Sequence, residues 1–113
     1  MLNSTLNTTL TTNEFYVLLA LADKNLHGYG IRDQIAHDSD SILVLAPGAM
    51  YPLLGRLLKK NLVQRLEVDD SILISARYRL TEFGRRTLKR EITRLERAIS
   101  HAHYKLGRNF TKS

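Results

Sequence analysis

The sequence contains no cysteine, no tryptophan and only two prolines. Without cysteine the chain cannot form a disulfide scaffold, a cysteine-ligated zinc or iron–sulfur site, or a thiol nucleophile. It also lacks any apolar run near the roughly 18 residues that cross a membrane, and its first ten residues have neither the basic start nor the apolar stretch of a signal peptide. We therefore expect a cytoplasmic protein with no membrane partner.

What the chain does contain is an ordinary globular composition with an uneven charge. Its 113 residues, 43% apolar and 25% charged, suit one domain with one modest core. The formal net charge is +6, and residues 1–46 hold two basic and five acidic side chains whereas residues 47–113 hold fifteen and six. This asymmetry predicts that the second half binds a polyanion, although basic residues can also simply solubilise helix faces.

The N-terminal segment predicts a flexible arm followed by a helix. Residues 1–10 carry no charged side chain and indicate a loose arm, although their leucine spacing also permits a weak helix. Thr11 and Glu14 have the spacing of a capping box, so a helix is expected over about residues 12–24, with Asn25 in the left-handed conformation that ends it. The face expected to be buried carries Phe15, Leu18, Leu19 and Ala22.

Two further helices and a short strand are expected next. A second helix is predicted over about residues 29–37, and the short apolar run at residues 42–45 favours a strand. A third helix is predicted to begin at Gly48 or Ala49, because a proline at position 52 is tolerated only near a helix start. Asn61 suits the left-handed position after its end. The apolar face expected for this helix carries Met50, Leu53, Leu54, Leu57 and Leu58.

Alternation between apolar and polar residues begins at Val63 and continues to Leu80, with turn residues at 69–71. This pattern predicts a β-hairpin whose basic side chains share one face. Those side chains are Arg65, Arg77 and Arg79. Helix, helix, strand, helix and hairpin is the order of a winged helix-turn-helix domain, here expected over residues 11–80. The fold class expected is therefore mainly α with a small β-hairpin.

A last helix is predicted over residues 81–107, capped by Thr81 and ended by Gly107, with residues 108–113 as a tail. Its apolar residues follow a two-position heptad. They are Leu88, Ile92, Leu95, Ile99, Ala102 and Leu106. At about 37 Å this helix is too long for so small a domain to cover, so it is expected to pair with a second copy of the chain in a homodimer, with Phe15 of the first helix also at the interface. The alternative is that the stripe folds back on the first helix of the same chain.

Three segments together resemble the PadR-like family of bacterial transcriptional regulators. They are HGYGI (residues 27–31), PGAMYPLLGRLLKKNLV (47–63) and RYRLTEFG (77–84). The resemblance spans about residues 15–100, and the short chain is similar to the family branch with a single C-terminal dimerisation helix. It implies a homodimeric repressor, sometimes released by a small aromatic or cationic compound. No cofactor is expected.

The chain departs from the family pattern at several positions. Ala49 stands where the family usually has a threonine able to contact DNA, Gly30 where an acidic residue is common, and Pro47 at a more variable position. Loss of the hydroxyl at position 49 is expected to change affinity or base preference. The absence of tryptophan argues against a drug site built on stacked indoles.

The third helix is expected to present small and basic residues to double-stranded DNA. These are Gly48, Ala49, Tyr51, Pro52, Arg56, Lys59 and Lys60. We expect Tyr51 and Arg56 to make most groove contacts, with Arg56 pairing to a guanine or gripping a phosphate. Tyr51 borders the apolar stripe and could instead belong to the core. The arginines at 65, 77 and 79 are expected to contact phosphates, the alternative being a solvated sheet face.

Other chemistry finds little support in the sequence. His101 and His103 point to different sides of a helix, and the histidines at 27 and 37 have no fixed partner, so no metal site is expected. Gly28-x-Gly30 lacks the third glycine of a nucleotide fingerprint, and no nucleophile motif is present, so no enzyme activity is expected.

Three functions remain open at this stage. The first is a repressor released by an effector, the second a constitutive DNA-binding regulator, and the third a winged-helix protein-interaction module. An effector pocket, if there is one, is expected between two subunits, although the same residues could simply fill the dimer core. They are Phe15, Leu18, Leu19, Leu88, Ile92 and Ile99.

Overall fold

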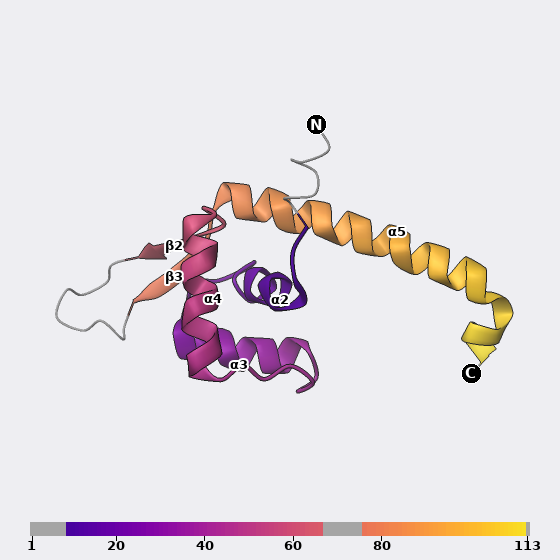
Figure 1. Ribbon diagram of the computed structural model, residues 1–113, viewed down its shortest axis with the longest axis horizontal. Helices are drawn as coiled ribbons and strands as arrows, with labels where there is room; N and C mark the ends of the chain where they lie inside the picture. Colours follow the sequence, from indigo (N-terminus) through magenta and orange to yellow (C-terminus); the bar gives the residue numbers. More distant parts are fainter. Residues whose placement is uncertain (1–8, 67–75, 113) are drawn as a thin grey trace.

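Three short helices and a small sheet pack beneath the first part of one long helix (Figure 1). The computed structural model describes residues 9–66 and 76–112, with side chains described as far as residue 107. The elements in chain order are α2 (Thr12–Ala20), β1 (Leu26–His27), α3 (Gly28–Asp38), α4 (Pro47–Lys59), β2 (Val63–Leu66), β3 (Arg77–Leu80) and α5 (Glu82–Lys112). This confirms the expected mainly helical fold with a small antiparallel sheet and a long C-terminal helix.

The sheet has the strand order β1-β3-β2, with both pairings antiparallel. Val63 lies opposite Leu80 and Arg65 opposite Tyr78, so these four side chains share the face turned to the core. Val63, Tyr78 and Leu80 are buried. The other face carries the exposed Gln64, Arg77 and Arg79 and the half-buried Leu66. The expected hairpin is thus present as β2 and β3, while its predicted turn at 69–71 lies outside the described residues.

Helix α2 starts as predicted but ends earlier than residue 24. Thr11 Oγ1 accepts from the Glu14 N–H at 3.1 Å, and the Thr11 N–H donates to Glu14 Oε1 at 2.9 Å, which completes the capping box. The helix ends at Ala20, and Asn25 is not left-handed. The chain turns early because residues 26–27 must reach β3 as strand β1. Leu18 is fully buried, as expected, whereas Phe15, Leu19 and Ala22 are only half-buried.

The strand predicted at residues 42–45 is wrong. The position beside β3 is filled by β1, and residues 42–45 are irregular. Side chains hold this segment instead: Ser39 Oγ accepts from the Leu43 N–H at 2.9 Å, and Arg32 Nε donates to the Leu45 carbonyl at 2.6 Å. Backbone groups bound in this way are no longer available to a strand partner. The apolar run that suggested a strand is only partly buried, with Leu45 inside and Ile42 87% exposed.

Helix α4 ends in the Schellman motif that the sequence indicates. Asn61 is left-handed with φ 61°, its N–H donates to the Leu58 carbonyl, and the Leu62 N–H donates to the Leu57 carbonyl, both at 3.0 Å. The helix begins at Pro47, one residue before the expected start, and Pro52 sits in its second turn. This well-formed end fixes the direction in which the chain enters β2.

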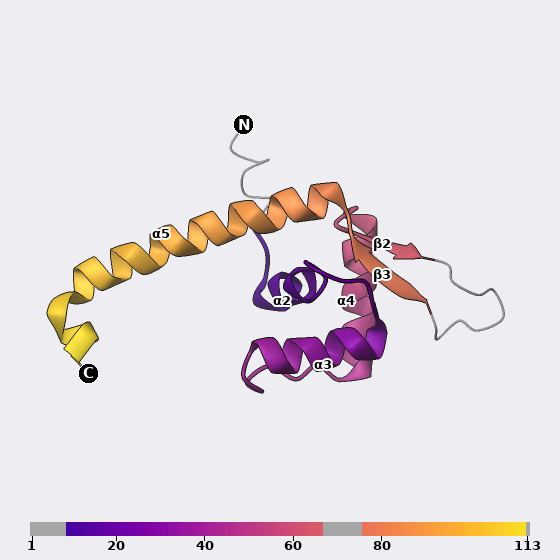
Figure 2. The same ribbon diagram turned by 180° about the vertical axis from the view of Figure 1, so that it is seen from behind.

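Helix α5 starts directly after the sheet and then leaves the domain (Figures 1 and 2). Thr81 Oγ1 accepts from the Gly84 N–H at 2.9 Å, which confirms the predicted cap. A Cβ at Gly84 would lie 2.1 Å from the Leu62 carbonyl oxygen, so only glycine allows α5 to approach the end of α4 this closely. Gly107, with φ 63°, kinks the helix where an end was expected. The predicted arm falls almost wholly outside the described residues.

Candidate nucleic-acid interface

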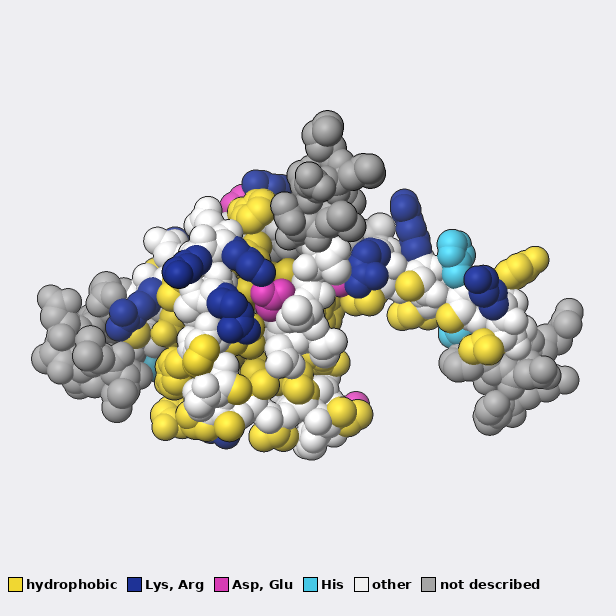
Figure 3. Space-filling model, viewed as in Figure 1, with side chains coloured by type: hydrophobic (Ala, Val, Ile, Leu, Met, Phe, Trp, Pro, Cys, Tyr) yellow, Lys and Arg dark blue, Asp and Glu magenta, His cyan; other side chains and the backbone are white. Residues whose placement is uncertain are grey.

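Helix α4 is buried along one side and exposed along the other. Its buried side carries Met50, Leu53, Leu54 and Leu57, as the apolar spacing predicts. Its exposed side carries Gly48, Ala49, Pro52, Arg56 and Lys59. Lys and Arg side chains gather over this helix in the space-filling view (Figure 3). Neither cation on this side forms an ion pair with a residue of the described ranges. Among the described residues, the structure therefore presents a basic helix face that no acidic side chain neutralises.

Packing within the described chain does not explain why positions 48 and 55 of α4 are glycine. A Cβ at Gly48 or Gly55 would meet nothing within 4 Å. At Gly28, by contrast, a Cβ would lie 2.6 Å from the Tyr51 hydroxyl. Glycine in a helix interior costs stability, so its presence at position 55 calls for another explanation. Close approach of the α4 backbone to a partner provides one.

Tyr51 lies at the border between the exposed face of α4 and helix α3. Its hydroxyl rests over Gly28, the first residue of α3, while 43% of the residue stays exposed. The ring therefore does not belong to the closed core, which was one of the two alternatives left by the sequence. Its position links the HGYG and PGAMYP segments, because glycine at position 28 leaves room for the tyrosine.

Lys60, predicted as a DNA contact, is engaged within the molecule. Its Nζ lies 2.8 Å from Oε2 of Glu14, which is only 3% exposed. Burial raises the pKa of the Glu14 carboxyl, but the hydrogen bonds from Lys60 and Thr11 outweigh it and the pKa is lowered overall. This ion pair ties the start of α2 to the end of α4. Lys60 therefore serves the orientation of α4 rather than its free face.

Strands β2 and β3, called the wing below, separate the three arginines that were expected on one face. Arg77 pairs with Leu66 and Arg79 with Gln64, so both arginines lie on the exposed face of the sheet. Arg65 pairs with Tyr78 and lies on the opposite face, which corrects the expectation. In the observed register, each odd-numbered residue of β2 lies opposite an even-numbered residue of β3. The sequence alone does not reveal that register. Arg79 donates to Gln64 Oε1, so the Arg77 and Arg79 face is partly pre-ordered.

Tyr29 and Arg32 form a contact beside the start of α4 that sequence reasoning missed. Tyr29 is 58% exposed, and the Arg32 guanidinium lies 5.8 Å from its ring centroid. Arg32 also binds the Leu45 carbonyl, two residues before α4. An exposed tyrosine in the first turn of the second helix was the available signal. The contact places an aromatic side chain and a cation next to the entry of α4.

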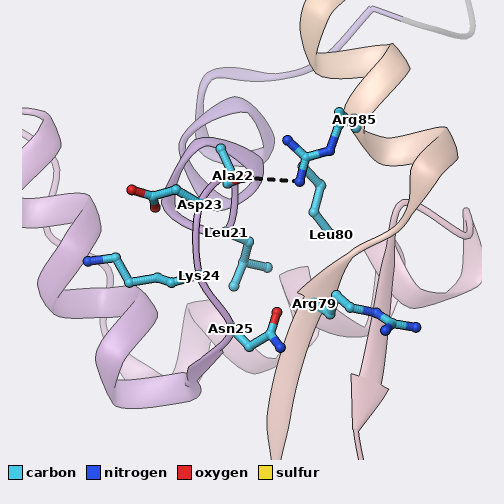
Figure 4. Close-up of a pocket in the computed structure, with 8 residues that line it drawn as sticks. All are labelled: Leu21, Ala22, Asp23, Lys24, Asn25, Arg79, Leu80 and Arg85. Atoms are coloured by element: carbon cyan, nitrogen blue, oxygen red, sulfur yellow. Dashed lines mark hydrogen bonds between the residues drawn. The ribbon is translucent and has the colours of Figure 1, made fainter.

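A second cluster of cations lies behind the sheet, in a pocket of about 360 Å³ between the end of α2, β3 and α5 (Figure 4). Arg85 reaches across it and donates to the Ala22 carbonyl at 3.0 Å. Lys24 and Arg79 point away from each other, toward opposite sides of the pocket (Figure 4). These cations do not converge on one point. Arg85 instead fastens α5 to the end of α2.

The residues predicted for a dimer seam divide into two groups. Leu88 is 4% exposed and belongs to the core of its own chain. Farther along α5 exposure rises: Ile92 is 36% exposed, Leu95 is half-buried, and Ile99 and Leu106 are 54% and 53% exposed. Ala102 is also exposed, and hydrophobic side chains are visible along this outer half of α5 (Figure 3). The stripe therefore does not fold back on its own chain over that half.

The six residues predicted for an effector pocket are not brought together. Leu18 and Leu88 are sealed in the core, and Ile99 lies far along the free part of α5. Phe15 instead lines a pocket of about 250 Å³ between the start of α2 and α5. Its other lining residues are Leu10, Thr11, Thr12, Tyr16, Glu91, Arg94 and Leu95. Glu91 is 5% exposed and bound by Arg94 at 2.6 Å. The pocket is aromatic on one wall and carries this ion pair on the other.

The described residues hold neither a metal site nor a membrane-crossing helix. No cluster of three or more histidine and carboxylate side chains suited to a metal ion occurs among them. None of the helices in the described ranges combines the length and apolar character of a membrane-crossing segment.

Comparison with known proteins identifies the family. The model of the transcriptional regulator PadR-like family matches residues 17–90, well over half of the chain. A protein of Streptomyces fradiae described as an uncharacterized 37.1 kDa protein in transposon Tn4556 is 41% identical over 78 residues. That match covers 69% of the present chain and 21% of the relative, so this chain spans about a fifth of its length.

Solved structures share the fold. A transcriptional regulator from Clostridium thermocellum superposes with a TM-score of 0.70 at 19% identity, over 83% of this chain and 92% of that one. The Bacillus subtilis PadR crystallised in complex with operator DNA gives a TM-score of 0.63 at 19% identity, over 73% of this chain and 47% of that one. At such identities the agreement concerns the fold, and it supports the winged-helix assignment made from the order of elements.

Proposed function

The chain belongs to the PadR-like family of transcriptional regulators, and we propose that it is a homodimeric repressor that binds a pseudo-palindromic operator in double-stranded DNA. The observation that carries this proposal is the exposed face of α4, where small residues alternate with cations that form no ion pair within the described ranges. A helix of this kind fits the major groove, where backbone approach and side-chain donors are both needed. The relative crystallised with operator DNA supports the same partner class.

Within this proposal the contact residues have different roles. Arg56 reaches base edges or a phosphate from the middle of the face, and Lys59 lies one turn farther along. Gly48, Ala49, Pro52 and Gly55 let the helix backbone sit deep in the groove. Tyr51 contacts DNA from the border next to α3. The arginines at 77 and 79 grip phosphates from the outer face of the wing.

The dimer is proposed to form through α5. Leu95, Ile99 and Leu106 line the heptad seam on the part of the helix that leaves the domain. Two copies joined along this seam would bury it and hold two α4 faces about 34 Å apart, which is one turn of duplex DNA. The domain plan follows: residues 11–80 bind DNA and residues 81–107 dimerise.

The test is selection from a random duplex library with the full chain, followed by fluorescence anisotropy across a salt series. We expect enrichment of a two-fold related site bound with a Kd on the order of 10⁻⁸ M or below, and loss of that binding in Arg56→Ala. Lys24→Ala removes an exposed cation outside the interface and serves as the matched control. If the chain binds no duplex from the library at about 0.1 M salt, the proposed repressor function is wrong and the protein-interaction module is favoured.

A second candidate property is release by an effector. The pocket between α2 and α5 favours it, because Phe15 and Tyr16 pack edge to face at 5.6 Å beside the buried Glu91. A planar aromatic cation could stack on this wall and compete with Arg94 for the carboxylate. Titration with ethidium in the absence of DNA tests this, since binding raises its fluorescence. Phe15→Ala should abolish the signal, and a constitutive regulator would show none in the parent chain.

A further inference from the structure

Helix α5 carries a basic stripe on its outer side, made of Arg86, Arg90, Arg97 and, in line with them, Tyr104. At 100° per residue these four side chains fall within about 40° of one another on the helix circumference. All four are exposed in the described chain, Tyr104 to 87%. The outer stripe therefore forms a continuous ridge that rises about 16 Å from the first arginine to the last.

The outer stripe lies on a different side of α5 from the buried residues of that helix and from its apolar seam. Among the residues of α5 buried against the domain, Leu88 lies about 175° and Glu91 about 125° around the helix from the centre of the stripe. The apolar seam lies nearly opposite the stripe, with Leu95 and Ile99 at its centre. Dimerisation through that seam would therefore leave the outer stripe exposed on both copies.

Acidic side chains do little to neutralise the outer stripe. Glu82 approaches Arg86 at 3.9 Å, a surface ion pair whose side chains are 76% and 59% exposed and which is therefore weak. Glu91 is buried and held by Arg94. Arg90 and Arg97 form no ion pair with any described residue. Arg86 and Arg90 lie one helical turn apart, about 6 Å along the axis, and Arg97 follows about 10 Å farther on, so the like charges repel one another and a polyanion would relieve that repulsion.

We propose that the outer stripe of α5 binds the phosphate backbone of a second DNA duplex, so that one dimer bridges two DNA segments. The stripe's chemistry favours phosphate, because arginine guanidinium groups and a tyrosine hydroxyl are common donors to phosphate oxygens. Ser100 adds another exposed hydroxyl beside the line. A duplex presents one negative charge about every 1.7 Å, which suits a linear ridge of cations better than a compact acidic patch does. This inference rests on the proposed operator binding by α4.

Bridging also follows from effective concentration. Once the α4 faces hold an operator, flanking DNA of the same molecule is tethered close to the outer stripe. A weak, sequence-independent contact then becomes significant, because the second binding event is intramolecular. The expected consequence is looping or condensation of DNA around the operator, in addition to occupancy of the site.

The experiment uses the full chain bound to an excess of bead-immobilised operator duplex, so that both reading faces are filled. A fluorescent duplex without an operator is then added at about 0.1 M salt. We expect the parent chain to capture the second duplex and the Arg90→Gln/Arg97→Gln variant to capture about tenfold less, since two phosphate contacts are lost. Its affinity for a short operator duplex should change less than twofold.

A matched control removes two exposed lysines outside the stripe, as Lys24→Gln/Lys105→Gln, and should capture the second duplex like the parent chain. Three outcomes would each overturn the inference. The control could lose as much capture as the stripe variant, the stripe variant could capture as much second duplex as the parent chain, or the parent chain could capture none. Displacement of the duplex by polyglutamate at matched charge would do the same, by assigning the stripe to an acidic protein. In all these outcomes operator binding on the beads persists, which separates them from a failure of the proposed function.

Discussion

Replacement of Gly55 by alanine separates what α4 needs for folding from what it needs for binding. Gly55 lies in the interior of the helix, and a Cβ there would have no neighbour within 4 Å. Alanine is favoured over glycine in a helix interior by about 0.8–1.0 kcal/mol. Gly55→Ala should therefore raise the free energy of unfolding by about 1 kcal/mol, and the midpoint of thermal unfolding by about 4–8 °C.

The same methyl group should weaken operator binding. If the α4 backbone approaches the groove at position 55, an added methyl overpacks a well-packed interface, at a cost of about 1–3 kcal/mol. Operator affinity should then fall roughly 5- to 150-fold while the protein becomes more stable. Thermal unfolding by circular dichroism and anisotropy on the selected operator measure the two effects on one sample.

The matched control is Gly84→Ala, where the new Cβ would lie 2.1 Å from the Leu62 carbonyl oxygen. This variant should lose stability, yet its folded fraction should bind the operator normally. Two results would refute the reasoning. Destabilisation by Gly55→Ala would mean that α4 is packed at that position, and unchanged operator affinity would mean that the helix does not approach DNA there.

Four further substitutions test other parts of the structure. Arg77→Ala should weaken operator binding and reduce the slope of log K against log salt by about one unit, and an unchanged slope would exclude its phosphate contact. Leu95→Arg should give monomers by analytical ultracentrifugation, and a surviving dimer would contradict the seam. Lys60→Met leaves the buried Glu14 unpaired and should cost about 1–3 kcal/mol at pH 7 in urea unfolding. Because the pKa of Glu14 is lowered in the fold, this pair stabilises the protein above the ordinary value of 4.5, and the difference between variant and parent should shrink as the pH falls below it. Thr87→Val should raise stability by about 1 kcal/mol, since Thr87 Oγ1 is buried with no hydrogen-bond partner in the described structure; a loss of stability would reveal a hidden partner.

The sequence predicts the local features of this fold well, because caps depend on residues that are neighbours in the chain. The capping box at Thr11 and the left-handed Asn61 are both confirmed. Strand 42–45 failed for the opposite reason. Whether an extended apolar segment joins a sheet depends on which partner edge is free, and here residues 26–27 occupy that edge. Nothing within the segment itself carries that information.

The candidate site shows the same division between local and distant information. Burial on α4 follows from helical spacing, so the exposed face could be derived from the sequence. The opposite placement of Arg65 could not, because it depends on the register between β2 and β3. The contact of Tyr51 with Gly28 was equally out of reach, since it joins two segments 23 positions apart.

Net charge is the sequence property that most strongly suggested a polyanion, and the structure shows how differently individual cations contribute to it. Lys60 and Arg94 are bound to buried carboxylates, and Arg85 is bound to a backbone carbonyl. These three contacts join elements of the fold, and a partner could recruit the cations only by breaking them. Arg56 has no such contact in the described chain, so it can bind phosphate or base without that cost. A polyanion should therefore select cations that the described structure leaves without an ion pair, among them Arg56 on α4, Arg77 on the outer face of the wing, and Arg90 and Arg97 on the outer stripe of α5.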